Sequence, residues 1–90
     1  MLLKTNKTQF YNLLKDKTDI KLPKMREIEF FKRKNYFHFI TLNYEISLLV
    51  CAGFPRIVIR EYDSDKGFFF HPTITLSVDE LINRGMIKVT

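Results

Sequence analysis

The chain has 90 residues, with 15 Lys and Arg against 10 Asp and Glu, so its formal net charge is +5. Hydrophobic residues make up 46% of it, which is typical of a globular protein and excludes a disordered tail or a fibrous repeat. Because a chain this short holds a single core, residues 1–90 are predicted to form one domain.

The sequence shows no sign of export or of membrane insertion. Only two apolar residues separate Met1 from Lys4, so no signal-peptide core is visible. The longest apolar run, Leu48 to Phe54, is far shorter than the roughly 20 residues that a membrane-spanning helix needs. The single cysteine, Cys51, excludes a disulfide within the chain. We therefore expect a cytoplasmic protein without a membrane partner.

The positive charge is unevenly distributed along the chain. Residues 1–40 carry ten basic and four acidic side chains, whereas residues 41–90 carry five basic and six acidic ones. This asymmetry predicts an anionic partner for the first half. Residue types with A/T-rich codons (Lys, Asn, Ile, Phe and Tyr) total 37 of 90, which suggests an AT-rich genome such as that of a low-GC bacterium, its phage or a mobile element.

The first predicted element is an amphipathic helix over residues 5–17. Leu3, Phe10, Leu13 and Leu14 fall within one arc of a helical wheel, as a helix with one buried face requires. Thr5, Asn6 and Thr8 are the candidate caps.

The middle of the chain predicts an antiparallel sheet. Alternating apolar and charged residues, β-branched residues and polar turns recur from Met25 onward. The expected strands are residues 26–30, 36–42, 45–51, 56–62 and 68–71, with turns at 32–35 and 63–67. The strand over 45–51 is nearly all apolar, which favours a central position with both faces buried.

The last third predicts a short helix followed by a possible final strand. Ser77 and Glu80 have the spacing of a capping box, and Gly85 is a typical helix stop. Residues 86–89 then favour a short strand. The expected fold is α+β: an N-terminal amphipathic helix, an antiparallel sheet of four or five strands and a short C-terminal helix.

The strongest functional pattern is a set of cations interleaved with aromatic residues. Cations neutralise phosphates, and aromatic rings stack with unpaired bases. The pattern therefore predicts a non-catalytic protein that docks on nucleic acid or on an anionic protein surface of a complex that handles it. The candidate interface residues are Lys4, Lys7, Lys15, Lys24, Arg26, Lys32, Arg33, Lys34 and Tyr36. Tyr11 and His38 are further candidates for base stacking. A solvated turn that keeps a sheet edge soluble is the alternative explanation of these charges.

Neighbouring phenylalanines suggest a second class of function. In Phe30-Phe31 and Phe68-Phe69-Phe70, adjacent rings must point to opposite faces of a sheet. If helices cover only one face, rings on the other face form a contact surface. The alternatives are thus an inhibitor or adaptor that binds a host enzyme through exposed aromatics or a sheet edge, and a homodimeric structural subunit.

Catalysis has little support in the sequence. Glu61, Asp63 and Asp65 alternate, and His71 follows across the hairpin, but acids at a loop tip commonly serve turn formation. Cys51 has the apolar surroundings of an inert buried thiol, and the spacing of His38 and His71 fits no zinc motif. We expect no enzymatic activity, no metal site and no cofactor.

Overall fold

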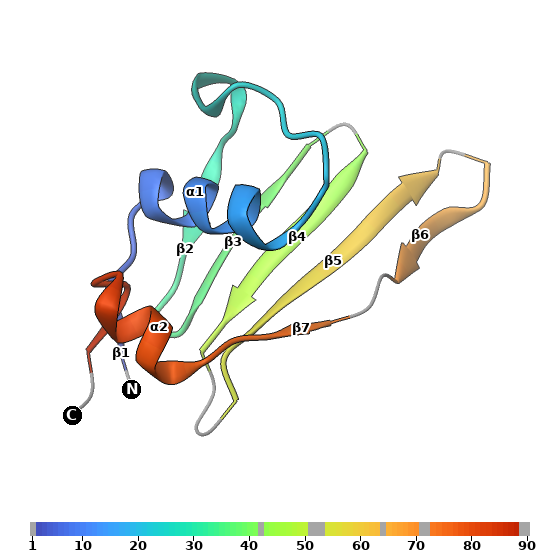
Figure 1. The fold of residues 1–90 in the computed structure, drawn as a ribbon. Coiled ribbons are helices and arrows are strands. Elements are labelled where there is room, and N and C mark those ends of the chain that lie inside the picture. The colour runs from blue at the N-terminus through green and yellow to red at the C-terminus, as the bar shows by residue number, and fades with distance from the viewer. Residues whose placement is uncertain (1, 42, 51–53, 64, 71–72, 89–90) are drawn as a thin grey trace.

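The computed structural model describes residues 2–41, 43–50, 54–63, 65–70 and 73–88. Helix α1 (Lys7–Lys17) crosses one face of an antiparallel sheet, and the short helix α2 (Val78–Asn83) lies on the same side (Figure 1). These elements confirm the predicted α+β fold with a helix near each end. In the described part of the chain, no helix is long and apolar enough to span a membrane.

The main sheet has the strand order β2-β3-β4-β5-β6, and β7 pairs with the other end of β5. Its strands are β2 (Phe30–Lys32), β3 (Tyr36–Ile40), β4 (Tyr44–Leu49), β5 (Arg56–Asp63), β6 (Gly67–Phe70) and β7 (Ile74–Thr75). β4 is the central strand, as its apolar run predicts, but only Ile46, Ser47 and Leu48 of it are buried, so the expected burial of both faces is incomplete. The ends of the chain meet in a separate two-stranded sheet of β1 (Leu2–Leu3) and β8 (Ile87–Lys88), a pairing that we did not predict.

The predicted strand over residues 26–30 is wrong in its bounds. Met25–Glu27 instead form a 3₁₀ helix, η1, because the Glu27 and Ile28 N–H groups donate to the carbonyls of Lys24 and Met25. These local bonds satisfy the backbone before any sheet pairing begins. β2 starts at Phe30 and includes Lys32, which we expected in the turn.

Both helices begin at a polar cap. Asn6 caps α1 in a capping box in which its side chain accepts from the Gln9 N–H and the Gln9 side chain accepts from the Asn6 N–H. Ser77 caps α2 by accepting from the Glu80 N–H at 3.5 Å. The predicted return bond from the Glu80 side chain to Ser77 is not found, because the Glu80 carboxylate is paired with two cations.

Phe10 forms the centre of the core. Its ring is fully buried and lies 6.2, 5.1 and 5.5 Å (centroid to centroid) from the rings of Phe30, Phe37 and Phe39, on β2 and β3. Aromatic rings at these separations attract one another beyond the area that they bury. One side chain of α1 thus fixes the helix on the sheet.

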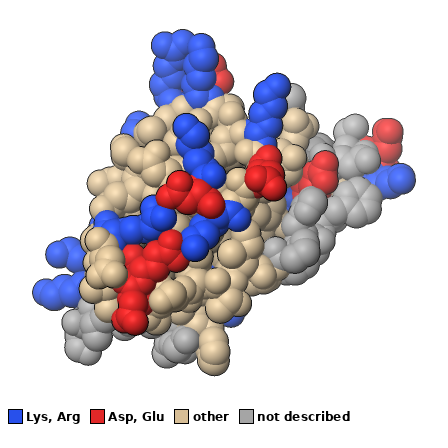
Figure 2. Space-filling model, viewed as in Figure 1, with Lys and Arg blue, Asp and Glu red and all other residues tan. Residues whose placement is uncertain are grey.

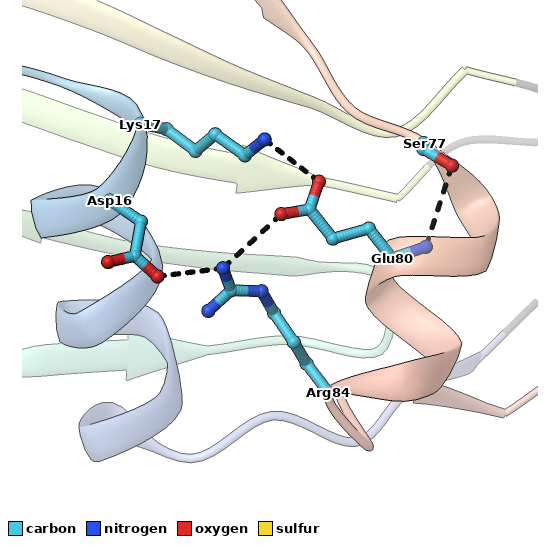
Figure 3. A network of polar contacts seen from close by, with 5 residues as sticks. All are labelled: Asp16, Lys17, Ser77, Glu80 and Arg84. Atoms are coloured by element: carbon cyan, nitrogen blue, oxygen red, sulfur yellow. Dashed lines mark hydrogen bonds and ion pairs between the residues drawn. The ribbon is translucent and has the colours of Figure 1, made fainter.

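A polar network links the two helices (Figure 3). Arg84, which follows α2, donates to Asp16 of α1 at 2.7 Å and to Glu80 at 3.3 Å. Lys17 of α1 lies 3.0 Å from the second oxygen of the same Glu80 carboxylate. The hydrogen bond from Lys17 is the main reason that the pKa of Glu80 is lowered, and the bond to Asp16 raises the pKa of Arg84. The ionised Glu80 carboxylate therefore stabilises the α1–α2 contact.

The network predicts an acid-sensitive stability term. The pKa of Glu80 is lower in the folded chain than its ordinary value of 4.5, so the stabilisation is complete above that value and is lost as the pH falls through the folded-state pKa. Because the pair is partly solvated, we expect Glu80→Gln to cost only about 0.5–1 kcal/mol near pH 7.

Chemical unfolding of both proteins between pH 7 and pH 3 measures this term. The difference between the wild type and Glu80→Gln should shrink as the pH falls. Asp79→Asn is the matched control, because Asp79 lies in the same first turn of α2. An equal pH dependence in the two variants would assign the effect to the helix dipole instead.

Candidate nucleic-acid interface

The sheet has one covered and one open face. Strand alternation places Phe30 toward α1 and Phe31 on the opposite face, where 44% of its surface is exposed. Ile40 on β3 is 53% exposed on the same face. The prediction that Phe30 and Phe31 point to opposite faces is thus confirmed. The corresponding prediction for residues 68–70 concerns side chains outside the described part of the structure.

A cluster of three rings occupies the open face near the β2–β3 turn. The pairing register places Phe31 opposite His38, and their rings stack at 5.1 Å with 21° between the planes. Tyr36 lies two residues before His38, and its ring centroid is 4.7 Å from the imidazole. The hydroxyls of Ser47 and Tyr36 are 3.3 Å apart, which holds Tyr36 over β4. We call Phe31, Tyr36 and His38 the ring cluster.

The ring cluster contains one buried polar atom without a hydrogen-bond partner in the described structure, Nδ1 of His38. Such an atom loses its hydration on folding without regaining a bond, which costs stability. The Nδ1 atom therefore does not hold this ring in place, whereas the contacts of the ring with Phe31 and Tyr36 do.

Cations flank the ring cluster on the open face. Arg56 on β5 lies in the same cross-strand row as Tyr36, with Leu49 between them. Two strand spacings separate Arg56 from Tyr36, or roughly 10 Å. Arg60 shares this face but is 3.8 Å from Glu45. At the other side of the cluster, the exposed Arg33 follows β2 in the turn.

The structure brings together five of the nine predicted interface residues. Lys32, Arg33 and Lys34 form the exposed end of the β2–β3 hairpin, and Tyr36 begins the returning strand. The Leu3 N–H donates to the Lys34 carbonyl at 3.4 Å, which places Lys4 beside this turn. We call Lys4 and Lys32–Lys34 the basic turn.

The other four predicted residues do not belong to this group. Lys7 and Lys15 lie on α1, about 12 Å apart along its axis at 1.5 Å per residue. Lys24 precedes η1 and Arg26 lies within it, at the opposite end of β2 from the basic turn. The structure does not bring these four together with the basic turn, because α1 and η1 hold them elsewhere, and their role in binding stays a prediction.

The described residues form no continuous basic patch on the helix-bearing face. Figure 2 shows this face, with Lys and Arg side chains interspersed with Asp and Glu. The Lys15 ammonium lies 5.4 Å from the centroid of the Tyr11 ring, and the Tyr11 hydroxyl donates to the Pro23 carbonyl at 2.8 Å. Tyr11 is thus engaged within the protein, and its predicted stacking role is not supported.

Sequence reasoning missed Arg56 and did not decide on which face Phe31 lies. Both depend on strand pairing between residues distant in the chain. The alternation of Phe30 and Phe31 was the available signal, but it cannot tell which face the helices cover. Arg56 begins a strongly apolar strand and gave no signal of its own.

Among the described residues, the structure shows no arrangement that supports the catalytic alternatives. His71 and Cys51 lie outside the described residues, and the described ones contain no group of three or more His, Cys, Asp or Glu side chains that could hold a metal ion. A depression of about 470 Å³ lies between the loop after α1 and the β3–β4 turn, and its lining includes Lys21, Glu27 and Asn43. The absence of enzymatic activity stays a prediction.

Comparisons with known proteins leave the site to be interpreted on its own geometry. No protein-family model, curated protein sequence or solved structure matches the chain.

The unpartnered nitrogen of His38 gives a stability prediction. His38→Phe keeps a flat ring beside Phe31 and removes the buried polar atom, so we expect the free energy of unfolding to rise by about 1 kcal/mol. Thermal unfolding of the two proteins measures the change. His38→Ala, which removes the ring as well, should lower the melting temperature, and a destabilised His38→Phe would show that Nδ1 is satisfied.

Proposed function

We propose that the protein binds single-stranded nucleic acid on the open face of its sheet, without catalysis and with little sequence preference. The observation that carries the proposal is the exposed Phe31 ring, which lies with the half-buried Tyr36 and His38 beside the basic turn. Exposed rings stack with unpaired bases, and adjacent cations contact the phosphates that link them. In double-stranded nucleic acid the bases are already stacked in the helix, so these rings favour single strands.

The arrangement of the open face supports this choice. Phe31 is on the edge strand and presents 44% of its surface to solvent. Arg33 and Arg56 lie on opposite sides of the cluster, so a strand that crosses the rings meets a cation at each side. On the covered face, by contrast, acidic side chains lie among the cations (Figure 2).

A protein target remains the second candidate, and one observation favours it. Phe31 and Ile40 are exposed apolar side chains on one face of the sheet. Such residues serve as anchors in protein interfaces. Binding through them would persist at high salt, whereas nucleic-acid binding would weaken steeply as salt rises.

The first test removes the exposed ring. Phe31→Leu keeps an apolar side chain but loses the stacking surface, and loss of one stacked base lowers affinity by about tenfold. Fluorescence anisotropy with a labelled 12-mer single strand measures this loss. Ile40→Ala is the matched control, since Ile40 is also exposed on this face but has no ring. Equal affinities for Phe31→Leu and the wild type would contradict the proposed stacking.

The second test compares cations by position. Replacing Lys32, Arg33 and Lys34 by Ala should reduce the slope of log affinity against log salt by about 2, at roughly 0.7 per lost phosphate contact on a single strand. The same change at Lys7 and Lys15 of α1 and at Lys21 in the loop after it removes the same charge outside the basic turn. If both triple variants lose affinity equally, net charge alone explains the binding.

A further inference from the structure

The edge strand β2 carries a charge pattern that is complementary to itself. β2 is the first strand of the main sheet, and no strand of the described structure pairs with its outer side (Figure 1). Acidic residues precede it, Glu27 and Glu29, and basic residues end it, Lys32, Arg33 and Lys34. When two copies of such a strand run antiparallel, the acidic end of each lies beside the basic end of the other.

The hydrogen bonds within the hairpin determine which groups of β2 point outward. The Arg33 N–H donates to the Tyr36 carbonyl at 2.6 Å, so residues 33 and 36 form a hydrogen-bonded pair. Such pairs alternate along an antiparallel ladder, so Phe31 bonds to His38 in the same way. The N–H and C=O groups of Phe30 and Lys32 therefore point away from the sheet.

The part of the β2 edge that is free to pair with another strand is limited at both ends. The Lys34 carbonyl accepts from the Leu3 N–H, so β1 covers the edge beyond the turn. At the other end, η1 stops at Glu27. The available edge thus extends from Ile28 to Arg33, and Phe31 lies near its middle.

From this pattern we infer that two copies of the chain pair antiparallel through β2, about a two-fold axis at Phe31. Phe30 of each copy then lies opposite Lys32 of the other, where both have outward N–H and C=O groups. Glu29 lies opposite Arg33 of the second copy, and the two Phe31 rings meet at the axis. Directly opposed side chains on one face of an antiparallel pair are close enough to interact.

The pairing also extends the open face. Residues 29, 31 and 33 share that face by alternation, so both ion pairs and both Phe31 rings lie on it. The two ring clusters become neighbours across the axis, and the helices of both copies lie on the opposite side. The inference goes beyond the proposed function and does not require it, because it concerns the protein without nucleic acid.

Reciprocal charge reversal tests the inference. Sedimentation equilibrium without nucleic acid should show a monomer–dimer equilibrium for the wild type. Glu29→Arg and Arg33→Glu, each alone, place like charges opposite each other twice per dimer, and we expect each to weaken dimerisation by about tenfold or more. The double variant restores both pairs in exchanged positions and should recover the dimer.

Mixing the two single variants gives the decisive measurement. A chain with Arg at positions 29 and 33 meets a chain with Glu at both, so the mixture should form a heterodimer although neither variant dimerises well alone. Lys24→Glu, a reversal outside the paired segment, is the control and should leave the dimer intact.

Backbone pairing has a separate test. Lys32→Pro removes an outward-pointing N–H, which the monomer does not use, and should abolish the dimer while the circular dichroism spectrum stays native. A monomeric wild type at millimolar concentration would overturn the inference. So would a dimer that none of the charge reversals changes. Neither result would affect the nucleic-acid tests, which measure binding to the open face.

Discussion

The structure depends on the packing of Phe10 against the phenylalanines of β2 and β3. This ring selects the face of the sheet that α1 covers, because Phe30, Phe37 and Phe39 all point toward it. Once that face is taken, strand alternation leaves Phe31 on the other side. The open surface and the exposed Phe31 ring are therefore consequences of the core. A one-residue change of strand register would exchange the covered and the open faces of the strand.

The contact between the helices reinforces the same division. Asp16 and Lys17 of α1 face Glu80 and Arg84 at α2 (Figure 3), and the Gln9 side chain donates to the Arg84 carbonyl at 2.9 Å. Ion pairs of this exposure stabilise little individually. Their effect is to keep α2 beside α1, so that both helices shield one face and neither reaches the other.

Local patterns in the sequence predicted most helices, strands and hairpins, but not the pairing of strands that are distant in the chain. The helix over residues 5–17 and the hairpins follow from periodicity and turn residues, which are properties of neighbouring positions. The β1–β8 pairing and the row from Tyr36 to Arg56 join residues far apart in the chain, and no local pattern encodes them. For the same reason, net charge predicted an interface in the first half that included Lys15 and Lys24, which the fold does not bring together with the basic turn.

The order of charges along β2 distinguishes the proposed pairing from its neighbours. A shift of the axis to Lys32 would place that ammonium opposite its own copy, and like charges directly opposite are unfavourable. A shift to Phe30 would place Phe31 opposite Glu29 and would require Glu27, which η1 holds outside the strand. A parallel pairing in register would place the three cations of one copy beside the same three cations of the other, where like charges repel. Charge repulsion therefore disfavours the pairing centred on Lys32 and the parallel pairing, and η1 excludes the pairing centred on Phe30. The antiparallel pairing centred on Phe31 meets neither obstacle.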